Sequence, residues 1–245
     1  MNSWCKNLEL LIKSRTSLIW VRTKEEERLE KILNFLCERS NIKRYVCWDC
    51  VNGIKGLINE EGKFSNNPIG ILNWLKEQSP KVPTILLVKD FHKFYDDPTI
   101  NRTIKELSSA LKETNHNLII SSHLFPSSEE LDELMTIVNL PLPDQKELKN
   151  LIKKIAINTN SNLNEKDLNE LSLASSGLTE IKVKQVTAKA LAQRGKISKE
   201  DIKEILEEKK QVIARSEILE FFEAKSSQDD IGGLNVLKVW LNQRY

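Results

Sequence analysis

The chain has 245 residues, of which 40% are hydrophobic and 29% are charged, and its formal net charge is +2. The length allows one large domain or two small ones, with enough apolar side chains for a sizeable core. The near-neutral charge gives no electrostatic argument for nucleic acid or an anionic membrane as a partner, so we expect neither.

The sequence also bears on where the protein acts. No stretch approaches the roughly 20 apolar residues of a spanning helix, and the first residues do not form a signal peptide. The cysteines, which are Cys5, Cys37, Cys47 and Cys50, are too few for a disulfide scaffold. We therefore expect a soluble protein in a reducing compartment, acting where it is made.

The first half of the chain alternates short apolar runs with helical periods. The run 17–21 predicts a buried strand, and Thr23 and Glu26 then form a predicted capping box, with Thr23 as N-cap, before a helix. A second strand is predicted at 44–48. Gly53, Gly56 and Gly62 indicate a loop after it, and Pro68 opens a short helix.

The alternation continues as far as residue 140. Strands are predicted at 84–88, 118–122 and 136–140, and a helix is predicted to begin at Asp97-Pro98. The run 84–88 has the apolar character of a strand covered by helices on both faces. Strands and helices alternating at this spacing indicate a parallel sheet of about five strands with right-handed crossovers.

After Pro141 and Pro143 the pattern is purely helical. One helix carries Leu148 to Ala156 on its apolar face, a second ends at Gly177, and a third, with Ile181 and Val186 on its apolar face, ends at Gly195. A fourth begins at Ser198 as N-cap. The polar stretch 225–230 is a candidate linker.

A parallel sheet followed by helices is the layout of a nucleotide-binding domain with a helical lid. In that layout, phosphate binds a glycine-rich turn after the first strand, because backbone N–H groups must approach it closely. Here the turn 21–26 contains no glycine, and Glu25, Glu26 and Glu27 stand at the helix N-terminus. The motif G-x-x-x-x-G-K-[ST] occurs nowhere in the chain, so we expect no nucleotide hydrolysis by it.

Polar residues at the ends of two later strands are candidate catalytic groups. Asp90 follows the run 84–88, where a magnesium-binding carboxylate would sit, but Phe91 replaces the general base. We interpret Asp90 as a remnant with a structural role, such as capping the turn to His92; metal binding is the alternative. For Ser121-Ser122-His123, without a phosphate cradle, strand-end hydrogen bonding is favoured over orientation of an attacking water.

Other chemistry-bearing residues give weaker patterns. Cys47 and Cys50 form a single C-x-x-C at a strand end, where the two side chains would point to opposite faces; a zinc site would need a second pair. His92, His116 and His123 are scattered over strand ends and loops. The sequence therefore predicts no metal site and no nucleophilic catalysis. Phe221-Phe222 is either a partner-docking face or part of the chain's own packing.

Short stretches spread over nearly the whole chain resemble one known family. They are 25–29, Trp48-Asp49 with Gly56-Leu57, 85–92, 140–143, 176–178, 205–213, 219–221 and 230–234. In this order they resemble the plastid- and cyanobacteria-encoded AAA-type ATPases known as hypothetical chloroplast reading frame forty-six. The resemblance implies a tandem protein, in which a degenerate AAA-like domain precedes an active AAA module.

The resemblance also implies which residues would meet a nucleotide. Ile231, Gly232 and Gly233 would begin the active module and border adenine in a complete protein. This chain covers about the first half of the family and ends before any P-loop, so ATP and magnesium are expected only of the absent module. We expect no cofactor and transfer no catalytic residue.

The sequence thus predicts an α/β, P-loop-NTPase-like three-layer domain without its P-loop at residues 1–143. A helical lid would span 144–197, and a connector with the stub of a missing AAA module 198–245. The expected function is the non-catalytic, regulatory or substrate-recognising N-terminal portion of an AAA ATPase. Its expected partner is a protein, either a separately encoded AAA module or a second copy, in a plastid stroma or cyanobacterial cytoplasm.

Three alternatives stay open. The first is a P-loop-less subunit of a clamp loader, although the residues after Ser216 are too few for a collar domain. The second is a stand-alone protein-binding adaptor. The third is an enzyme that uses Asp90, Asp49 and His92, which would require these side chains to converge in one pocket.

Overall fold

The computed structural model describes residues 3–39, 44–126 and 131–214. They belong to two compact units, Met1–Leu142 and Pro143–Tyr245. The predicted linker 225–230, the Phe221-Phe222 pair and Ile231 to Gly233 lie outside the described residues. Each unit is described here by itself.

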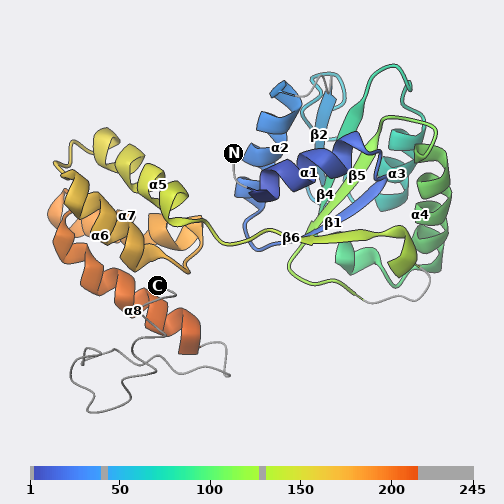
Figure 1. The fold of residues 1–245 in the computed structure, drawn as a ribbon. Coiled ribbons are helices and arrows are strands. Elements are labelled where there is room, and N and C mark those ends of the chain that lie inside the picture. Colours follow the sequence, from blue (N-terminus) through green and yellow to red (C-terminus); the bar gives the residue numbers. More distant parts are fainter. Residues whose placement is uncertain (1–2, 40–43, 127–130, 215–245) are drawn as a thin grey trace, which may run out of the picture. The chain divides into compact units, whose positions relative to one another are not determined.

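The first unit is built on a six-stranded sheet with the order β3-β2-β4-β5-β1-β6 (Figure 1). The strands are β1 (Leu18–Arg22), β2 (Arg44–Asp49), β3 (Gly53–Lys55), β4 (Thr84–Lys89), β5 (Asn117–Ser122) and β6 (Thr136–Asn139). All adjacent pairs are parallel except β2 and β3, which are antiparallel. The predicted parallel sheet is confirmed.

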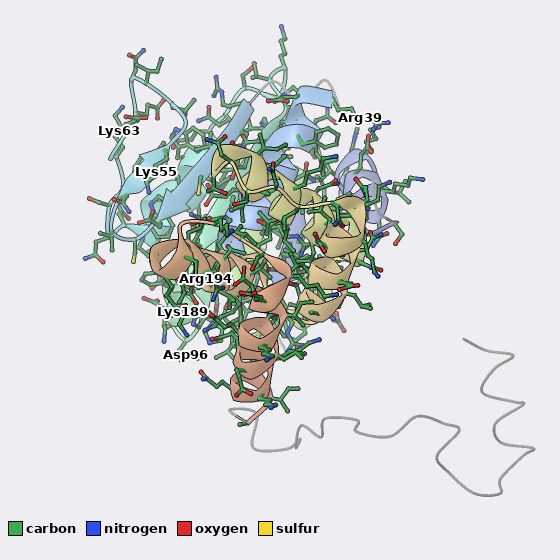
Figure 2. The ribbon with its side chains drawn as sticks, turned by 90° about the vertical axis from the view of Figure 1, so that its left-hand side faces the viewer. Arg39, Lys55, Lys63, Asp96, Lys189 and Arg194 are labelled. Carbon is green, nitrogen blue, oxygen red and sulfur yellow. The ribbon has the colours of Figure 1, made fainter. Side chains whose placement is uncertain are left out.

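β3 corrects the prediction that a loop follows β2. Gly53 begins this strand with φ +67, and a Cβ on it would lie 2.4 Å from the Lys63 carbonyl oxygen, so only glycine fits. The Ile54 N–H donates to the same carbonyl over 2.9 Å. Lys55 and Lys63 accordingly lie close together at this edge (Figure 2). A strand of three residues that begins with Gly53 and is followed by Gly56 gives too short a pattern to be identified from the sequence.

Four helices complete the three predicted layers. They are α1 (Ser3–Lys13), α2 (Glu26–Arg39), α3 (Pro68–Lys76) and α4 (Pro98–Leu111), and short 3-10 turns lie at η1 (Phe91–Phe94) and η2 (Asp132–Leu134). α1 and α2 cover one face of the sheet, and α3 and α4 cover the other (Figure 1). Asn67 and Asp97 cap α3 and α4 through their side chains. α1 was not predicted.

The two faces of the sheet have separate apolar cores because successive strand residues point to opposite sides. On β1, Trp20 packs with α3 and α4, whereas Ile19 packs with α1 and α2. On β4, Leu86 likewise packs on the face covered by α3 and α4, and Leu87 packs on the face covered by α1 and α2. This burial on both faces explains why the central strands are continuous apolar runs.

The predicted capping box at the start of α2 is wrong in position. The helix begins at Glu26, and its first bond of the i to i−4 kind runs from the Leu29 N–H to the Glu25 carbonyl, 3.0 Å. Thr23 still belongs to the extended chain, since its N–H donates to the Ser122 carbonyl over 2.9 Å. Pairing with the end of β5 therefore delays the start of the helix.

The second unit is helical, as predicted. It contains α5 (Gln145–Asn158), α6 (Glu165–Ser175), α7 (Glu180–Arg194), η3 (Lys199–Asp201) and α8 (Ile202–Ala214). The Ser198 N–H donates to the Asp201 carboxylate over 2.9 Å at the start of η3, and Gly195 ends α7 in the left-handed conformation. Ile181, placed on the apolar face by its spacing, is 38% exposed.

α8 shares the core of this unit. Ile205 is buried in one apolar cluster with Leu148 of α5 and Leu168 of α6. Arg194 pairs with Asp201 and Glu204, and Lys189 lies near it on the same side of the unit (Figure 2). The predicted division into a lid at 144–197 and a connector at 198–245 stays a prediction, because residues 215–245 are not described. None of the helices described could cross a membrane.

His116 gives a test of the fold through pH. Its ring is buried beside β4, and its Nδ1 accepts the Thr84 N–H over 3.1 Å. Burial lowers the pKa of His116 below the usual 6.5, and Arg44 lowers it further, against the effect of the Gln78 carbonyl. Below pH 6.5 the unfolded chain therefore takes up a proton that the folded chain refuses, and stability falls as the pH falls.

We expect His116→Gln to remove this pH dependence, because the amide retains an acceptor but does not titrate. Urea unfolding at pH 7.5 and pH 5.0 measures the effect. The wild type should lose more free energy of unfolding than the variant between these values, by at most about 2 kcal/mol. Equal losses in the two proteins would show that His116 is not held neutral.

Candidate functional site

The carboxyl ends of the parallel strands meet at one edge of the sheet. Backbone hydrogen bonds connect them there: Thr23 N–H to Ser122 carbonyl, Asp90 N–H to Ser121 carbonyl and Leu140 N–H to Arg22 carbonyl, 2.9 to 3.1 Å. Ligands of open parallel sheets bind outside this edge, where the strand order changes direction. It is therefore the place to examine for a nucleotide or another ligand.

The turn between β1 and α2 is closed by its own side chains. Thr23 Oγ1 accepts the Glu25 N–H over 2.8 Å. The buried Glu25 carboxylate pairs with Arg28 Nη1 at 3.0 Å, and the same nitrogen donates to the Pro141 carbonyl at 2.5 Å. A phosphate at this helix N-terminus would need open backbone N–H groups. Here a carboxylate and its guanidinium are built into that turn instead.

The lysine nearest this turn on the central strand is also engaged. Lys89, at the end of β4, pairs with Glu30 and lies 3.9 Å from Glu26. Burial lowers the pKa of Lys89, but the hydrogen bond to Glu30 and the nearby charges outweigh it and raise the pKa. Burial and the charge of Asp90 raise the pKa of Glu26. The Lys89 ammonium group is therefore paired with two carboxylates of α2, those of Glu26 and Glu30.

Asp90 and His92 lie next to each other just beyond β4. Asp90 has φ 51, in the left-handed region, and its side chain makes no capping hydrogen bond to η1, so the predicted capping role for this side chain is wrong. Asp90 Oδ1 is 3.8 Å from His92 Nδ1. His92 Nδ1 is also 2.8 Å from Ser122 Oγ, which accepts the Leu124 N–H at 3.1 Å.

The prediction that the histidines are scattered is wrong for two of them. The rings of His92 and His123 pack edge to face with their centroids 5.2 Å apart. Burial lowers the pKa of His92, although the charge of Asp90 opposes this. His116 lies at the other end of β5, against Thr84. The strand-end bonding predicted for Ser122 is confirmed, because its hydroxyl links His92 to Leu124.

Asp49, the remaining residue of the enzymatic alternative, has a local role. It ends β2 and accepts the N–H groups of Val51 and Asn52 at 3.0 and 2.7 Å, and Lys55 lies 3.2 Å away. These bonds close the turn into β3. Asp90 and His92 thus come together, whereas Asp49 is not part of the His and carboxylate cluster found among the described residues.

The cysteines of the C-x-x-C pair point to opposite faces, as predicted. Cys47 is buried in the core beneath α1 and α2, and Cys50 packs against the core on the other face. Burial raises the pKa of Cys47 to about 12. A thiol with such a pKa is protonated at neutral pH, so it is neither a nucleophile nor a ready metal ligand.

Sequence comparison identifies the family. Residues 4–140 match the family described as SpoVK-like AAA ATPase, N-terminal domain, and residues 146–216 match its second domain. The chain is 34% identical over 245 residues to the uncharacterized AAA domain-containing protein ycf46 of Gracilaria tenuistipitata var. liui, and 31% identical over 242 residues to that of Guillardia theta. Each match covers 99% of this chain but only 50% of the Gracilaria protein and 48% of the Guillardia protein, so the chain spans about half the length of these relatives.

Solved structures support the fold. C. elegans PCH-2 is similar with a TM-score of 0.57 and 13% identity, covering 86% of this chain and 68% of that one. Domain III of the Thermotoga maritima replication initiation protein DnaA is similar with a TM-score of 0.52 and 13% identity, covering 84% and 92%. At this identity the likeness concerns the fold, and the α/β fold predicted from the sequence is confirmed.

The buried pair Glu25–Arg28 gives a test of the closed turn. Replacing one partner of a buried ion pair costs about 3–5 kcal/mol of stability. We expect Glu25→Gln with Arg28→Met to be less destabilised than the sum of the single variants, by about 1–3 kcal/mol. Urea unfolding of the four proteins measures this coupling.

Arg102 and Glu106 provide the matched control, since they are 2.9 Å apart but 73% and 48% exposed. Their coupling should be smaller than that of Glu25 and Arg28, because solvent screens an exposed ion pair. A coupling between Glu25 and Arg28 no larger than this control would contradict the role of the pair in closing the turn.

Proposed function

The chain belongs to the SpoVK-like AAA ATPase family, and on this premise we propose that it is a non-catalytic portion with a regulatory or substrate-recognising role. It is an N-terminal, ATPase-like portion by its match to the family and by its fold. What we add is that its own α/β unit does not bind nucleotide. It contributes to a AAA protein by contacts rather than by catalysis.

One observation carries this proposal: the turn after β1 is filled by its own ion pair. Glu25 and Arg28 are buried there, and Arg28 also holds the Pro141 carbonyl after β6. A triphosphate in this place would have to displace a buried salt bridge and then face the carboxylates of Glu26 and Glu27. Both steps oppose binding, because buried charges are costly to separate and like charges repel.

We place ATP and magnesium in a further AAA module. The relatives are about twice as long as the matched part, which leaves room for such a module in a protein of this family. Ile231, Gly232 and Gly233 would then border its adenine. The partner of the two described units is accordingly a AAA module, in the same chain or separately encoded, or a second copy of the chain.

The relatives also support a site of action. The similar ycf46 proteins come from plastid genomes of algae. We therefore propose the plastid stroma or the cytoplasm of a cyanobacterium as the compartment. The substrate that the portion would recognise is a protein, since the charge balance of +2 gives nucleic acid no advantage.

Titration with a fluorescent ATP analogue and Mg²⁺ tests the proposal. We expect fluorescence anisotropy of the analogue to show no saturable binding to the 245-residue chain, because the phosphate position is closed. A P-loop AAA protein titrated in parallel shows that the probe is competent.

Lys24→Ala is the matched variant, since Lys24 is the basic residue between the end of β1 at Arg22 and the start of α2 at Glu26. The same flat titration is expected for it. Saturable binding by the wild type that weakens in Lys24→Ala would place a nucleotide at this turn and overturn the proposal.

A further inference from the structure

Asp90, His92 and His123 form a cluster that the proposed function does not use. Each offers one ligand atom, and these atoms all lie within 4.8 Å of one another. Two of the residues follow β4 and the third follows β5, the adjacent parallel strand. The cluster therefore joins the ends of neighbouring strands, as metal-binding groups of parallel sheets do.

A second observation concerns the ring of His92. Its side chain is only 7% exposed, and its Nε2 is buried and has no hydrogen-bond partner among the residues that the structure describes. A buried polar atom left without a partner costs about 1–3 kcal/mol, so such an atom requires an explanation. Ser122 Oγ occupies Nδ1 at 2.8 Å. An outer partner on one ring nitrogen is the arrangement that orients a histidine toward a metal ion.

We propose that Asp90, His92 and His123 bind a zinc ion, through one carboxylate oxygen and one nitrogen of each imidazole. Two imidazoles and a carboxylate are a common ligand set for Zn²⁺, and the fourth position is then open to water. Mg²⁺ is disfavoured, because it takes oxygen ligands in octahedral geometry. The site thus differs in chemistry from the magnesium site of a nucleotide-binding domain.

Closing the cluster on an ion needs only small movements. Two ligands of a tetrahedral zinc ion lie about 3.4 Å apart, from bonds of about 2.1 Å. One ligand atom from each of the three residues already lies within 4.8 Å of the other two. Asp90 and His123 are exposed, so rotation of their side chains can bring the remaining atoms together while the buried His92 stays in place. The ion would then hold the ends of β4 and β5 together.

Zinc binding to the tag-free 245-residue chain, freed of metal with EDTA, tests the proposal. Titration against a chromogenic chelator should show saturable binding of Zn²⁺ at one equivalent per chain. Excess Mg²⁺ should leave the titration unchanged. No saturable binding, or displacement of Zn²⁺ by Mg²⁺, would refute the site.

The variants His123→Gln and Asp90→Asn change exposed residues, so the fold should be retained. Each should weaken Zn²⁺ binding at least about tenfold, and far-UV circular dichroism checks folding. His116→Gln alters the histidine at the opposite end of β5 and should bind as the wild type does. Equal affinity in all four proteins would mean that the ion binds elsewhere.

The absorption spectrum of the Co²⁺-loaded chain tests whether cysteine thiolates, rather than the proposed residues, bind the metal ion. Imidazole and carboxylate ligands give visible bands without the near-ultraviolet charge-transfer band of a thiolate. We expect visible bands that disappear in His123→Gln. A thiolate band, or visible bands unchanged in that variant, would overturn the proposal.

Discussion

The salt bridge between Glu25 and Arg28 is the interaction on which the first unit depends. It is buried at the N-terminus of α2, and the contact of Arg28 with the Pro141 carbonyl ties that helix to the chain leaving β6. A nucleotide-binding domain leaves this position open and lets the ligand complete it. In this chain, the turn is completed by residues that are always present, so its geometry does not depend on a ligand. The same turn lacks the glycine-rich backbone that binds phosphate in a nucleotide-binding domain.

Much of this fold could be predicted from local patterns. The central strands β1, β4 and β5 are rich in apolar residues because both of their faces are buried, and α5, α6 and α7 of the second unit begin at N-caps that the sequence shows. β3 could not be predicted, since its three residues pair only through a turn that Gly53 makes possible. The start of α2 was misplaced because Thr23 pairs with Ser122, a residue far away in the sequence.

The candidate site likewise has one feature that could be predicted from the sequence and one that could not. The missing glycine turn is a local feature, so its loss could be recognised from residues 21–26 alone. The cluster of Asp90, His92 and His123 depends on the adjacency of β4 and β5 and on the left-handed backbone at Asp90. The available signal was the polar run after each of two consecutive strands. Sequence gives the residue types in such runs, but it does not give the direction in which each side chain leaves the strand.

The arrangement of strand lengths has a consequence for assembly. The sheet ends in its two shortest strands, β3 of three residues and β6 of four. An edge strand exposes unpaired backbone groups that can recruit another chain, and short edges limit this. Another polypeptide would find few consecutive donors and acceptors at either border. Contacts that join this unit to other proteins should therefore involve side chains on helices and loops rather than continuation of the sheet.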